Sequence, residues 1–475
     1  MLFTELEFWA FFLVVMVAYV LLPHRGQNRM LLVASYVFYG AWDWRFLGLI
    51  LLSTGIDYLV ALRIRQESDD LRRRHWLMVS LAANLGMLAI FKYLGFFVDS
   101  FQELLGWAGY HPDPVMLAIV LPVGISFYTF QTLSYTIDVY RRELEPSRDF
   151  LDFALFVAFF PQLVAGPIER ASNLLPNIQN PRVLSWEALR RGAVLCLTGL
   201  IKKVVIADGV APSVDAIYSS PDPSRLDILF ATWLFAIQIY CDFSGYTDIA
   251  RGVAKMMGFH LMRNFAQPYF ATDPQEFWRR WHISLSTWLR DYLYISLGGN
   301  RGGRWKTYRN LMATMVLGGL WHGAAWNFVL WGFYQGVLLA GHRALAGRWG
   351  GPGRRPAGLG RLLWKGLVIA VFFQIVCYGW LLFRARSFEQ ITEFTGRLAG
   401  VLPAPAMLSM PVPPAASLLG IAVLFLWDAA IERRGDVQFY ARWPMVVRAG
   451  LYAGMIYLLA FGATTATSAF IYFQF

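Results

Sequence analysis

Long apolar stretches separated by short polar segments dominate the pattern along the chain. Seven of these stretches approach or exceed the roughly 20 residues that a helix needs to cross a bilayer core of about 30 Å. They cover residues 7–22, 46–62, 76–97, 114–140, 226–250, 361–384 and 446–475. With the shorter apolar runs between them, they predict an all-α, polytopic integral membrane protein with about nine to thirteen transmembrane helices.

Three parts of the chain do not fit a simple series of spans. Residues 151–165 form a short apolar run, and residues 186–206 carry arginines and lysines beside a long apolar face. Each of these two segments is predicted to be re-entrant, interfacial or spanning, and the pattern leaves the choice open. Residues 226–250 are span-like, but their second half contains Gln238, Asp242, Ser244, Thr247 and Asp248. Polar groups at that depth are predicted to face a protein-lined cavity rather than lipid.

The composition agrees with this pattern and limits the functional classes. Hydrophobic residues make up 57% and charged residues 15% of the chain, against about 45–50% and about 25% in soluble domains. The net charge of +11 does not indicate nucleic-acid binding, because the basic residues gather in short connecting loops. These loops are residues 63–74, 141–148, 301–309 and 354–361. They follow the positive-inside rule, which places the N-terminus, with Glu5 and Glu7, on the extracytoplasmic side.

The cysteines offer no further chemistry. Cys196, Cys241 and Cys377 are isolated, in or beside apolar runs, and lack disulfide or metal-ligand spacing. They are predicted to be packing residues, and no metal or bound cofactor is expected.

His282 lies in the sequence EFWRRWHISLSTWLRDYLYISLGG, residues 276–299. This stretch is predicted to form one amphipathic helix with an aromatic face and a polar face. The aromatic face carries Phe277, Trp281, Trp288, Tyr292 and Ile295, and the polar face carries Arg279, His282, Ser286 and Arg290. An interfacial helix anchored by its aromatics and a helix that lines a cavity for an anionic ligand fit the pattern equally well.

His322 lies in the sequence LGGLWHGAAWNFVLWG, residues 317–332, where glycines interrupt an apolar run. Both flanking loops are basic. Residues 310–342 therefore either enter the membrane and return to the same side, or cross it as a helix with a break. Glycine-interrupted helices at membrane depth are tolerated where they line a cavity. A buried imidazole is expected to stay neutral, because burial disfavours its charged form, and a neutral imidazole can act as a general base. A functional role is therefore favoured over a packing role.

Long motifs around both histidines resemble the membrane-bound O-acyltransferase family. The strongest matches are QPYFATDPQEFWRRWHISLSTWLRDYLYISLGGNR at 267–301 and YRNLMATMVLGGLWHGAAWNFVLWG at 308–332. Further matches are LPVGISFYTFQTLSYTIDVYR at 121–141, FFPQLVAGPIER at 159–170, IQIYCDFSGYTDIARG at 237–252 and FIYFQF at 470–475. The resemblance covers nearly the whole chain and is closest to the bacterial branch that acetylates exopolysaccharides such as alginate.

This resemblance implies a fold and an activity. The fold is a ring of tilted helices around a central tunnel, in one domain that covers residues 1–475. The catalytic core would span about 115–345, and residues 361–475 would form the C-terminal helices. The activity is transfer of an acetyl group from acetyl-CoA to a hydroxyl. The WHG histidine, His322, is then catalytic, and the RRWHISLS histidine, His282, is a second functional residue.

Other residues receive roles as hypotheses. Arg279, Arg280 and Arg290 could hold the phosphates of CoA, because guanidinium groups match phosphate oxygens, and Lys202 and Lys203 are weaker candidates. The tunnel could be lined by Asp242, Ser244 and Asp248. Asn327 is a tentative substrate-side residue, but its place on the helix does not allow it to be assigned as the oxyanion donor.

The resemblance also implies partners and a location. Relatives in this branch work in the bacterial inner membrane with a separate extracytoplasmic protein of the SGNH hydrolase-like type, which completes transfer to the polymer. Two alternatives remain open. One is transfer of D-alanine or another acyl group from a carrier protein to a cell-envelope polymer. The other is a transporter with the two histidines in its substrate path, which does not explain the motifs.

Overall fold

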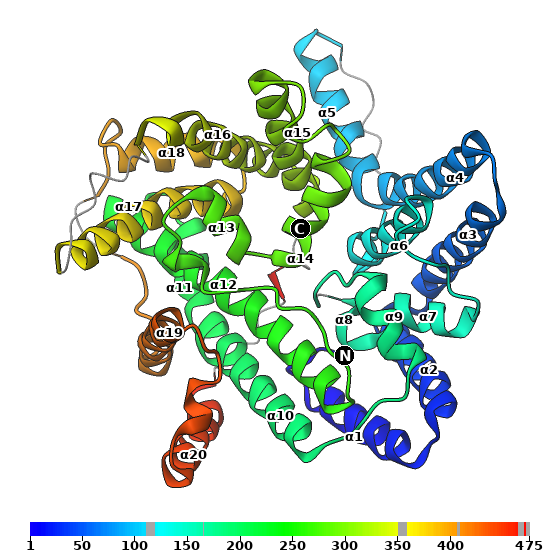
Figure 1. Ribbon diagram of the computed structural model, residues 1–475. Helices are drawn as coiled ribbons and strands as arrows, with labels where there is room; N and C mark the ends of the chain where they lie inside the picture. Colours follow the sequence, from blue (N-terminus) through cyan, green and yellow to red (C-terminus); the bar gives the residue numbers. More distant parts are fainter. Residues whose placement is uncertain (111–118, 165, 350–358, 406–408, 464–469, 472–475) are drawn as a thin grey trace. The chain divides into compact units, whose positions relative to one another are not determined.

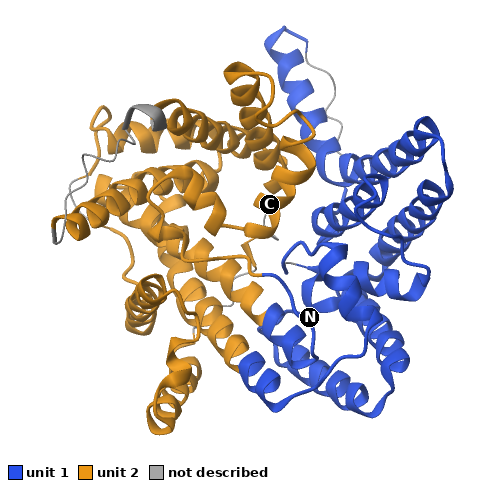
Figure 2. Ribbon diagram, in the orientation of Figure 1, with its two compact units in different colours: residues 1–193, 250–262 blue, residues 194–249, 263–475 orange. Residues whose placement is uncertain are grey.

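The computed structural model describes the chain except for residues 111–118, 165, 350–358, 406–408, 464–469 and 472–475. The described residues form helices and no strands, which confirms the predicted all-α class (Figure 1). They divide into two compact units, coloured separately in Figure 2. Unit 1 contains residues 1–193 and 250–262, and unit 2 contains residues 194–249 and 263–475.

Unit 1 consists of helices from the first part of the chain around an aromatic core. Its helices are α1 (Leu6–Leu21), α2 (His24–Asp43), α3 (Leu47–Gln66), α4 (Asp70–Leu88), α5 (Leu94–Trp107), α6 (Ile125–Tyr140), α7 (Phe150–Ala158), α8 (Phe160–Leu163) and α9 (Ala171–Gln179). Short helical turns, η1 (Trp44–Phe46) and η2 (Ala89–Tyr93), connect α2 to α3 and α4 to α5. Phe3, Phe8 and Phe160 are fully buried, and Phe38 packs against them.

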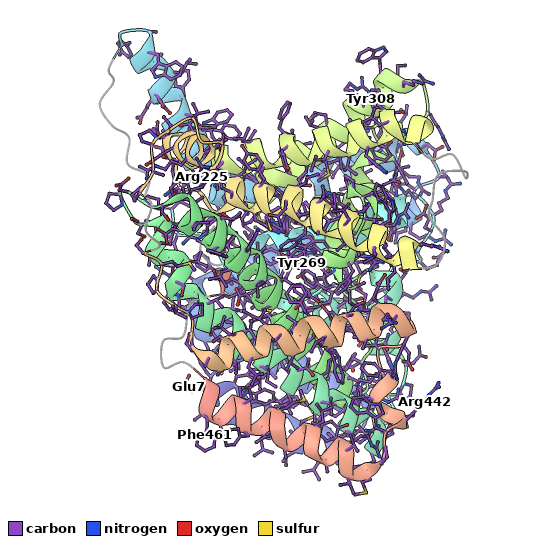
Figure 3. All side chains as sticks on the ribbon, turned by 90° about the vertical axis from the view of Figure 1, so that its left-hand side faces the viewer. Glu7, Arg225, Tyr269, Tyr308, Arg442 and Phe461 are labelled. Atoms are coloured by element: carbon purple, nitrogen blue, oxygen red, sulfur yellow. The ribbon has the colours of Figure 1, made fainter. Side chains whose placement is uncertain are left out.

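Unit 2 carries most of the motif residues. Its helices are η3 (Ile201–Ala207), α11 (Asp208–Tyr218), η4 (Pro268–Phe270), α13 (Pro274–Arg280), α14 (Ile283–Trp288), η5 (Leu289–Tyr294), α15 (Arg304–His322), α16 (Trp326–Trp349), α17 (Leu359–Arg384), α18 (Phe388–Leu398), α19 (Ala415–Arg434), η6 (Phe439–Arg442) and α20 (Met445–Gly462). Two helices, α10 (Trp186–Leu200) and α12 (Arg225–Met256), belong partly to each unit. Figure 3 places Arg225 and Arg442 at opposite sides of unit 2, with Tyr269 between them.

Six helical runs in the described part of the chain are long and apolar enough to cross a membrane, which agrees with a multi-pass membrane protein. They are His24–Gln66, Asp70–Trp107, Arg225–Met256, Gly360–Arg384, Ala415–Arg434 and Met445–Gly462. The first two runs have 43 and 38 residues. At about 1.5 Å per residue each is far longer than a core of about 30 Å. The first run contains two helices of 20 residues each, α2 and α3. The second contains α4 with 19 residues, followed by η2 and the shorter α5.

The structure corrects several predicted boundaries. The helix predicted at 114–140 begins only at Ile125, after a left-handed Gly124, and residues 111–118 lie outside the described part. Within the stretch predicted at 446–475, α20 covers Met445–Gly462, and residues 464–469 and 472–475 lie outside the described part. Two long helices, α2 and α19, were counted only among the shorter runs. Polar residues near their ends, such as Arg29 and Asp428, shorten the apolar signal.

The polar half of α12 is buried in protein, which agrees with the prediction that it does not face lipid, and the predicted cavity there stays a prediction. Asp242, Ser244 and Thr247 are at most 3% exposed, and Gln238 and Asp248 are half-buried. Residues 186–206 do not end as a separate segment, because α10 continues through η3 into α11. This continuous helix brings Lys202 and Lys203 against α12, where they pair with Asp248 and Asp242.

Candidate functional site

His322 is the last residue of α15 and lies at the turn of a tight helical hairpin. Helices α15 and α16 run antiparallel, because Gly319 faces Gly332 and Met312 faces Gly336. A Cβ on Gly319 would lie 2.2 Å from the carbonyl oxygen of Phe328, so only glycine permits this approach. The chain therefore reverses direction after His322, and how residues 310–342 lie in the membrane stays a prediction. The hairpin fixes the position of His322.

Aromatic rings surround the His322 imidazole, which is 4% exposed. The ring centroids of Trp321 and Trp331 each lie 5.1 Å from that of His322, and the centroid of Phe383 lies 5.6 Å away. All three contacts are edge-to-face. This lining shields the imidazole from water. Electrostatic interactions and hydrogen bonds of His322 are therefore stronger than they would be in solution.

His282 does not lie on a continuous amphipathic helix, and that prediction is wrong. Helix α13 ends at Arg280, Trp281 is extended, and His282 adopts a left-handed conformation with φ of +42° before α14 begins. The break turns His282 into the protein, where it is fully buried. It separates His282 from Arg279 and Arg290, both of which are exposed. A left-handed non-glycine residue costs about 1–3 kcal/mol, so surrounding contacts must hold it.

The structure brings His282 and His322 together. Their ring centroids are 6.3 Å apart, and Trp321 contacts both imidazoles. Phe243 of α12 packs edge-on against His282 with a centroid distance of 4.6 Å. Asn264 also contacts the ring, with its Oδ1 3.2 Å from Nδ1 of His282. Two buried imidazoles therefore lie in one aromatic cluster in unit 2, which is formed by Phe243, Trp321, Trp331 and Phe383.

Burial determines the charge state of His282, which lies outside the six candidate membrane helices. Removal from water lowers the pKa of His282 well below its usual value, and the neighbouring His322 lowers it further. Both effects disfavour the imidazolium form. His282 is therefore a neutral imidazole near neutral pH, with one nitrogen able to donate and the other able to accept a hydrogen bond.

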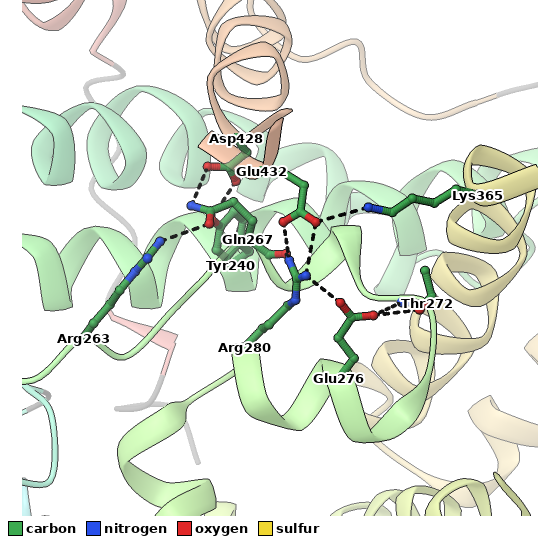
Figure 4. Close-up of polar contacts among 9 residues, drawn as sticks. All are labelled: Tyr240, Arg263, Gln267, Thr272, Glu276, Arg280, Lys365, Asp428 and Glu432. Atoms are coloured by element: carbon green, nitrogen blue, oxygen red, sulfur yellow. Dashed lines mark hydrogen bonds and ion pairs between the residues drawn. The ribbon is translucent and has the colours of Figure 1, made fainter. Parts of the chain in front are cut away.

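The three predicted arginines occupy different environments. Arg280 is held between carboxylates, with hydrogen bonds to Glu276 at 2.5 Å and to Glu432 at 2.6 Å (Figure 4). Lys365 reaches the same Glu432, so this network ties α13 to α17 and α19. Arg290 pairs with Asp291 at the surface, and Arg279 is exposed. Their proposed contact with phosphate stays a prediction, and the geometry leaves Arg279 more accessible than Arg280.

The predicted tunnel carboxylates are joined to the predicted lysines. Asp242 accepts from Lys203 at 2.7 Å, and Asp208 holds the same ammonium group at 2.7 Å. Asp248 pairs with Lys202 at 2.8 Å. The backbone N–H of Ile471 also donates to Asp242, at 2.7 Å, which holds Ile471 against α12. Buried charges need such partners, and these five charged residues join α12 to η3 and to the start of α11.

Asn327 and Ser244 complete the predicted set. The amide nitrogen of Asn327 donates to the carbonyl oxygens of Phe383 and Ala385, at 3.3 and 3.0 Å. It joins the start of α16 to the end of α17 and so helps to place Phe383 against His322. Ser244 is 1% exposed in α12. Catalytic or binding roles for these two residues stay predictions.

Sequence reasoning missed Asn264, Phe243, Trp331 and Phe383, which surround the two histidines. Phe243 lies in the polar half of α12, and Trp331 and Phe383 lie in apolar helices. In each place nothing in the pattern distinguishes an aromatic residue of the site from a packing one. Asn264 lies in the connector between α12 and η4. Its only signal is an amide among apolar residues, and connectors commonly contain asparagine.

A model of the MBOAT, membrane-bound O-acyltransferase, family matches residues 140–380, more than half of the chain. The match includes both histidines and their flanking motifs. It extends beyond the predicted core of about 115–345 at the C-terminal end, where it takes in most of α17.

Curated relatives are similar over most of the chain. The chain is 44% identical to the "Probable alginate O-acetylase" of Azotobacter vinelandii over 425 residues, which covers 89% of this chain and 82% of that protein. It is 34% identical to the "Peptidoglycan O-acetyltransferase" of Helicobacter pylori, over 84% of this chain and 79% of that protein. The "Teichoic acid D-alanyltransferase" of Bacillus subtilis is 27% identical, over 59% of this chain and 72% of that protein.

Proposed function

The chain belongs to the membrane-bound O-acyltransferase family, and from this premise we propose that it O-acetylates an exopolysaccharide such as alginate. As a family member it is a membrane-embedded acyltransferase. In the proposal the acetyl group comes from the cytosolic thioester acetyl-CoA and crosses the bacterial inner membrane through the protein. A separate extracytoplasmic protein of the SGNH type then completes transfer to the polymer. The high identity to alginate O-acetylases supports this choice of acyl group and polymer.

The observation that carries the proposal is the pair of buried imidazoles, His282 and His322, in one aromatic cluster. Acetyl transfer needs a base that takes the hydroxyl proton while the oxygen attacks the thioester carbonyl. We assign this base to His322. A new C–O bond forms, the C–S bond breaks, and the proton passes to the departing thiolate.

The donor site is proposed at the basic end of unit 2. Arg279 and Arg290 are exposed, and the basic loop 301–309 belongs to the same unit. Guanidinium groups there could hold the phosphates of CoA. The same surface could bind an acidic carrier protein, as the similarity to a teichoic acid D-alanyltransferase suggests. The identity over the chain is much higher for the acetylating relatives, so acetyl-CoA is the proposed donor.

The test uses purified protein in liposomes with radiolabelled acetyl-CoA, the extracytoplasmic partner and polymannuronate as acceptor. We expect His322→Ala to lower transfer by about 10²–10⁴-fold, the usual contribution of general acid–base catalysis. His75→Ala is the matched control, because His75 is an exposed histidine in unit 1 and should retain full activity. Normal transfer by His322→Ala would remove it from the mechanism. If the protein consumes a thioester bound to a carrier protein but not acetyl-CoA, the proposed donor is wrong.

A further inference from the structure

Asn264 contacts the strained turn at His282 through both its backbone and its side chain. It is fully buried. Its backbone carbonyl accepts from the N–H of Ile283 at 2.9 Å, and its Oδ1 accepts from the N–H of Ser284 at 3.1 Å. The Ser284 hydroxyl donates to the same Oδ1 at 2.9 Å. These contacts hold the residues that follow His282, and so they stabilise its left-handed backbone.

The contacts also fix which way the Asn264 amide points. A backbone N–H can only donate, so the side-chain atom that faces the N–H of Ser284 must be the amide oxygen and not the nitrogen. The same oxygen lies 3.2 Å from Nδ1 of His282. An amide oxygen can only accept, so Nδ1 must carry the proton in the neutral imidazole. The lone pair of His282 is therefore on Nε2.

We propose that Asn264 is a positioning residue that holds His282 in the Nδ1–H tautomer and so makes Nε2 a proton acceptor. This proposal rests on the proposed function and deepens it. In this tautomer a neutral His282 cannot donate a hydrogen bond from Nε2 to the oxyanion that forms on the thioester carbonyl. It can accept one from a hydroxyl or thiol. His282 thus assists proton movement, and stabilisation of the oxyanion must come from another group.

Because His282 is neutral, its tautomer decides which ring nitrogen can accept a proton. Burial lowers the pKa of His282, so the imidazole does not acquire a second proton near neutral pH. The His282 ring is packed between Phe243, Trp321 and His322, which restricts rotation of the imidazole. Without the Asn264 oxygen, the proton could move to Nε2, and the ring would present a donor where the reaction needs an acceptor.

The first measurement is independent of activity. Nitrogen-15 NMR of the full-length protein with labelled histidine, compared with His282→Gln to assign the signal, reports which ring nitrogen is protonated. We expect wild type to show protonated Nδ1 and bare Nε2, and Asn264→Ala to lose this preference. A protonated Nε2 in the wild type would overturn the proposal. If that signature is present but acetyl-CoA gives no transfer, the proposed function fails and the tautomer assignment stands.

The second measurement is the rate of acetyl transfer as a function of pH. Asn264→Ala should lower kcat roughly 10²-fold with KM changed less than threefold, because the contribution of a correctly protonated acid–base group is lost. Asn264→Asp keeps an acceptor for Nδ1–H and should retain at least a tenth of the activity. Its carboxylate favours the imidazolium form, so the acid limb of the pH profile should move to higher pH.

A matched control separates positioning from general loss of stability. Asn84 is also fully buried and makes side-chain hydrogen bonds, but it lies in α4 of unit 1. Asn84→Ala should lower thermal stability and leave the His282 signal and the pH profile unchanged. Equal kcat losses in Asn264→Ala and Asn264→Asp, with no movement of the acid limb, would show a merely structural role for Asn264 and contradict the proposal.

Discussion

Glu169 is a carboxyl group buried in unit 1 without a salt bridge among the described residues. Its two oxygens accept hydrogen bonds from the N–H of Met262 and from the amide of Asn173. Burial is the largest influence and raises the pKa of Glu169 to about 7, although those hydrogen bonds oppose it. The folded protein therefore binds a proton at this site more tightly than the unfolded chain does.

The stability of the protein should fall as this proton is lost. The folded-state pKa is raised, so the contribution of protonated Glu169 is complete below pH 4.5 and is lost as the pH rises to about 7. Glu169→Gln keeps the shape and an acceptor for Met262 but cannot ionise. We expect its thermal midpoint in detergent to exceed that of wild type at pH 8 by the equivalent of roughly 2–3 kcal/mol.

The measurement compares the two proteins at pH 5 and pH 8. At pH 5 wild-type Glu169 is mostly protonated in the folded state, so the two midpoints should nearly agree. A wild-type advantage at pH 8, or an identical pH dependence in both proteins, would contradict the raised pKa of Glu169.

The α15–α16 hairpin shows how one element positions His322, the proposed base. Gly319 and Gly332 let the two helices touch along their backbones, and Gly323 leaves room for the Phe328 ring at the turn. His322 is the residue at which α15 ends, so its direction depends on this contact rather than on its own neighbours in sequence. Any side chain at Gly319 must separate the helices and move the imidazole.

Gly319→Ala should therefore reduce both stability and transfer. Its Cβ would lie 2.2 Å from the carbonyl oxygen of Phe328, and overpacking of this kind costs about 1–3 kcal/mol. We expect a lower thermal midpoint and a loss of acetyl transfer of at least tenfold. The assay is the liposome reaction together with thermal unfolding.

Gly341→Ala is the control within the same hairpin. Nothing lies within 4 Å of a Cβ at Gly341 in α16. Alanine is favoured over glycine in a helix by about 0.5–1 kcal/mol, so this variant should be as stable as wild type or slightly more stable. Full activity in Gly319→Ala would show that the close contact does not position His322.

For the whole molecule, the charge pattern predicts which side of the membrane each end of unit 2 faces. Arg442 and the basic loop 354–361 follow the positive-inside rule and are assigned to the cytoplasm. Arg225 lies at the opposite side of the unit (Figure 3) and is assigned to the extracytoplasmic face. Both side chains are exposed, which makes them suitable for labelling.

Arg225→Cys should react with a membrane-impermeant maleimide in intact spheroplasts. Arg442→Cys should react only after the membrane is permeabilised. The three native cysteines, Cys196, Cys241 and Cys377, are buried, so the background from wild-type protein should be low. Labelling of Arg442→Cys in intact spheroplasts would invert the predicted topology.

The sequence alone determined the features that depend on local composition and on long motifs. Apolar stretches of spanning length gave the all-α membrane class, because backbone groups in lipid must be satisfied within helices. The glycines around His322 indicated an interrupted helix, and the flanking motifs indicated the family that the comparison with relatives confirmed. The buried polar half of α12 followed from the cost of exposing such groups to lipid.

Only the tertiary structure decided the geometry of the site. Periodicity placed His282 on an arginine face of one helix. Hydrogen bonds that the residues after His282 donate to Asn264 instead hold it in a left-handed turn that no propensity favours. The pairing of Lys202 and Lys203 with Asp248 and Asp242 joins residues about forty positions apart. Such contacts depend on which helix faces which, and helical periodicity carries no information about the partner of a face.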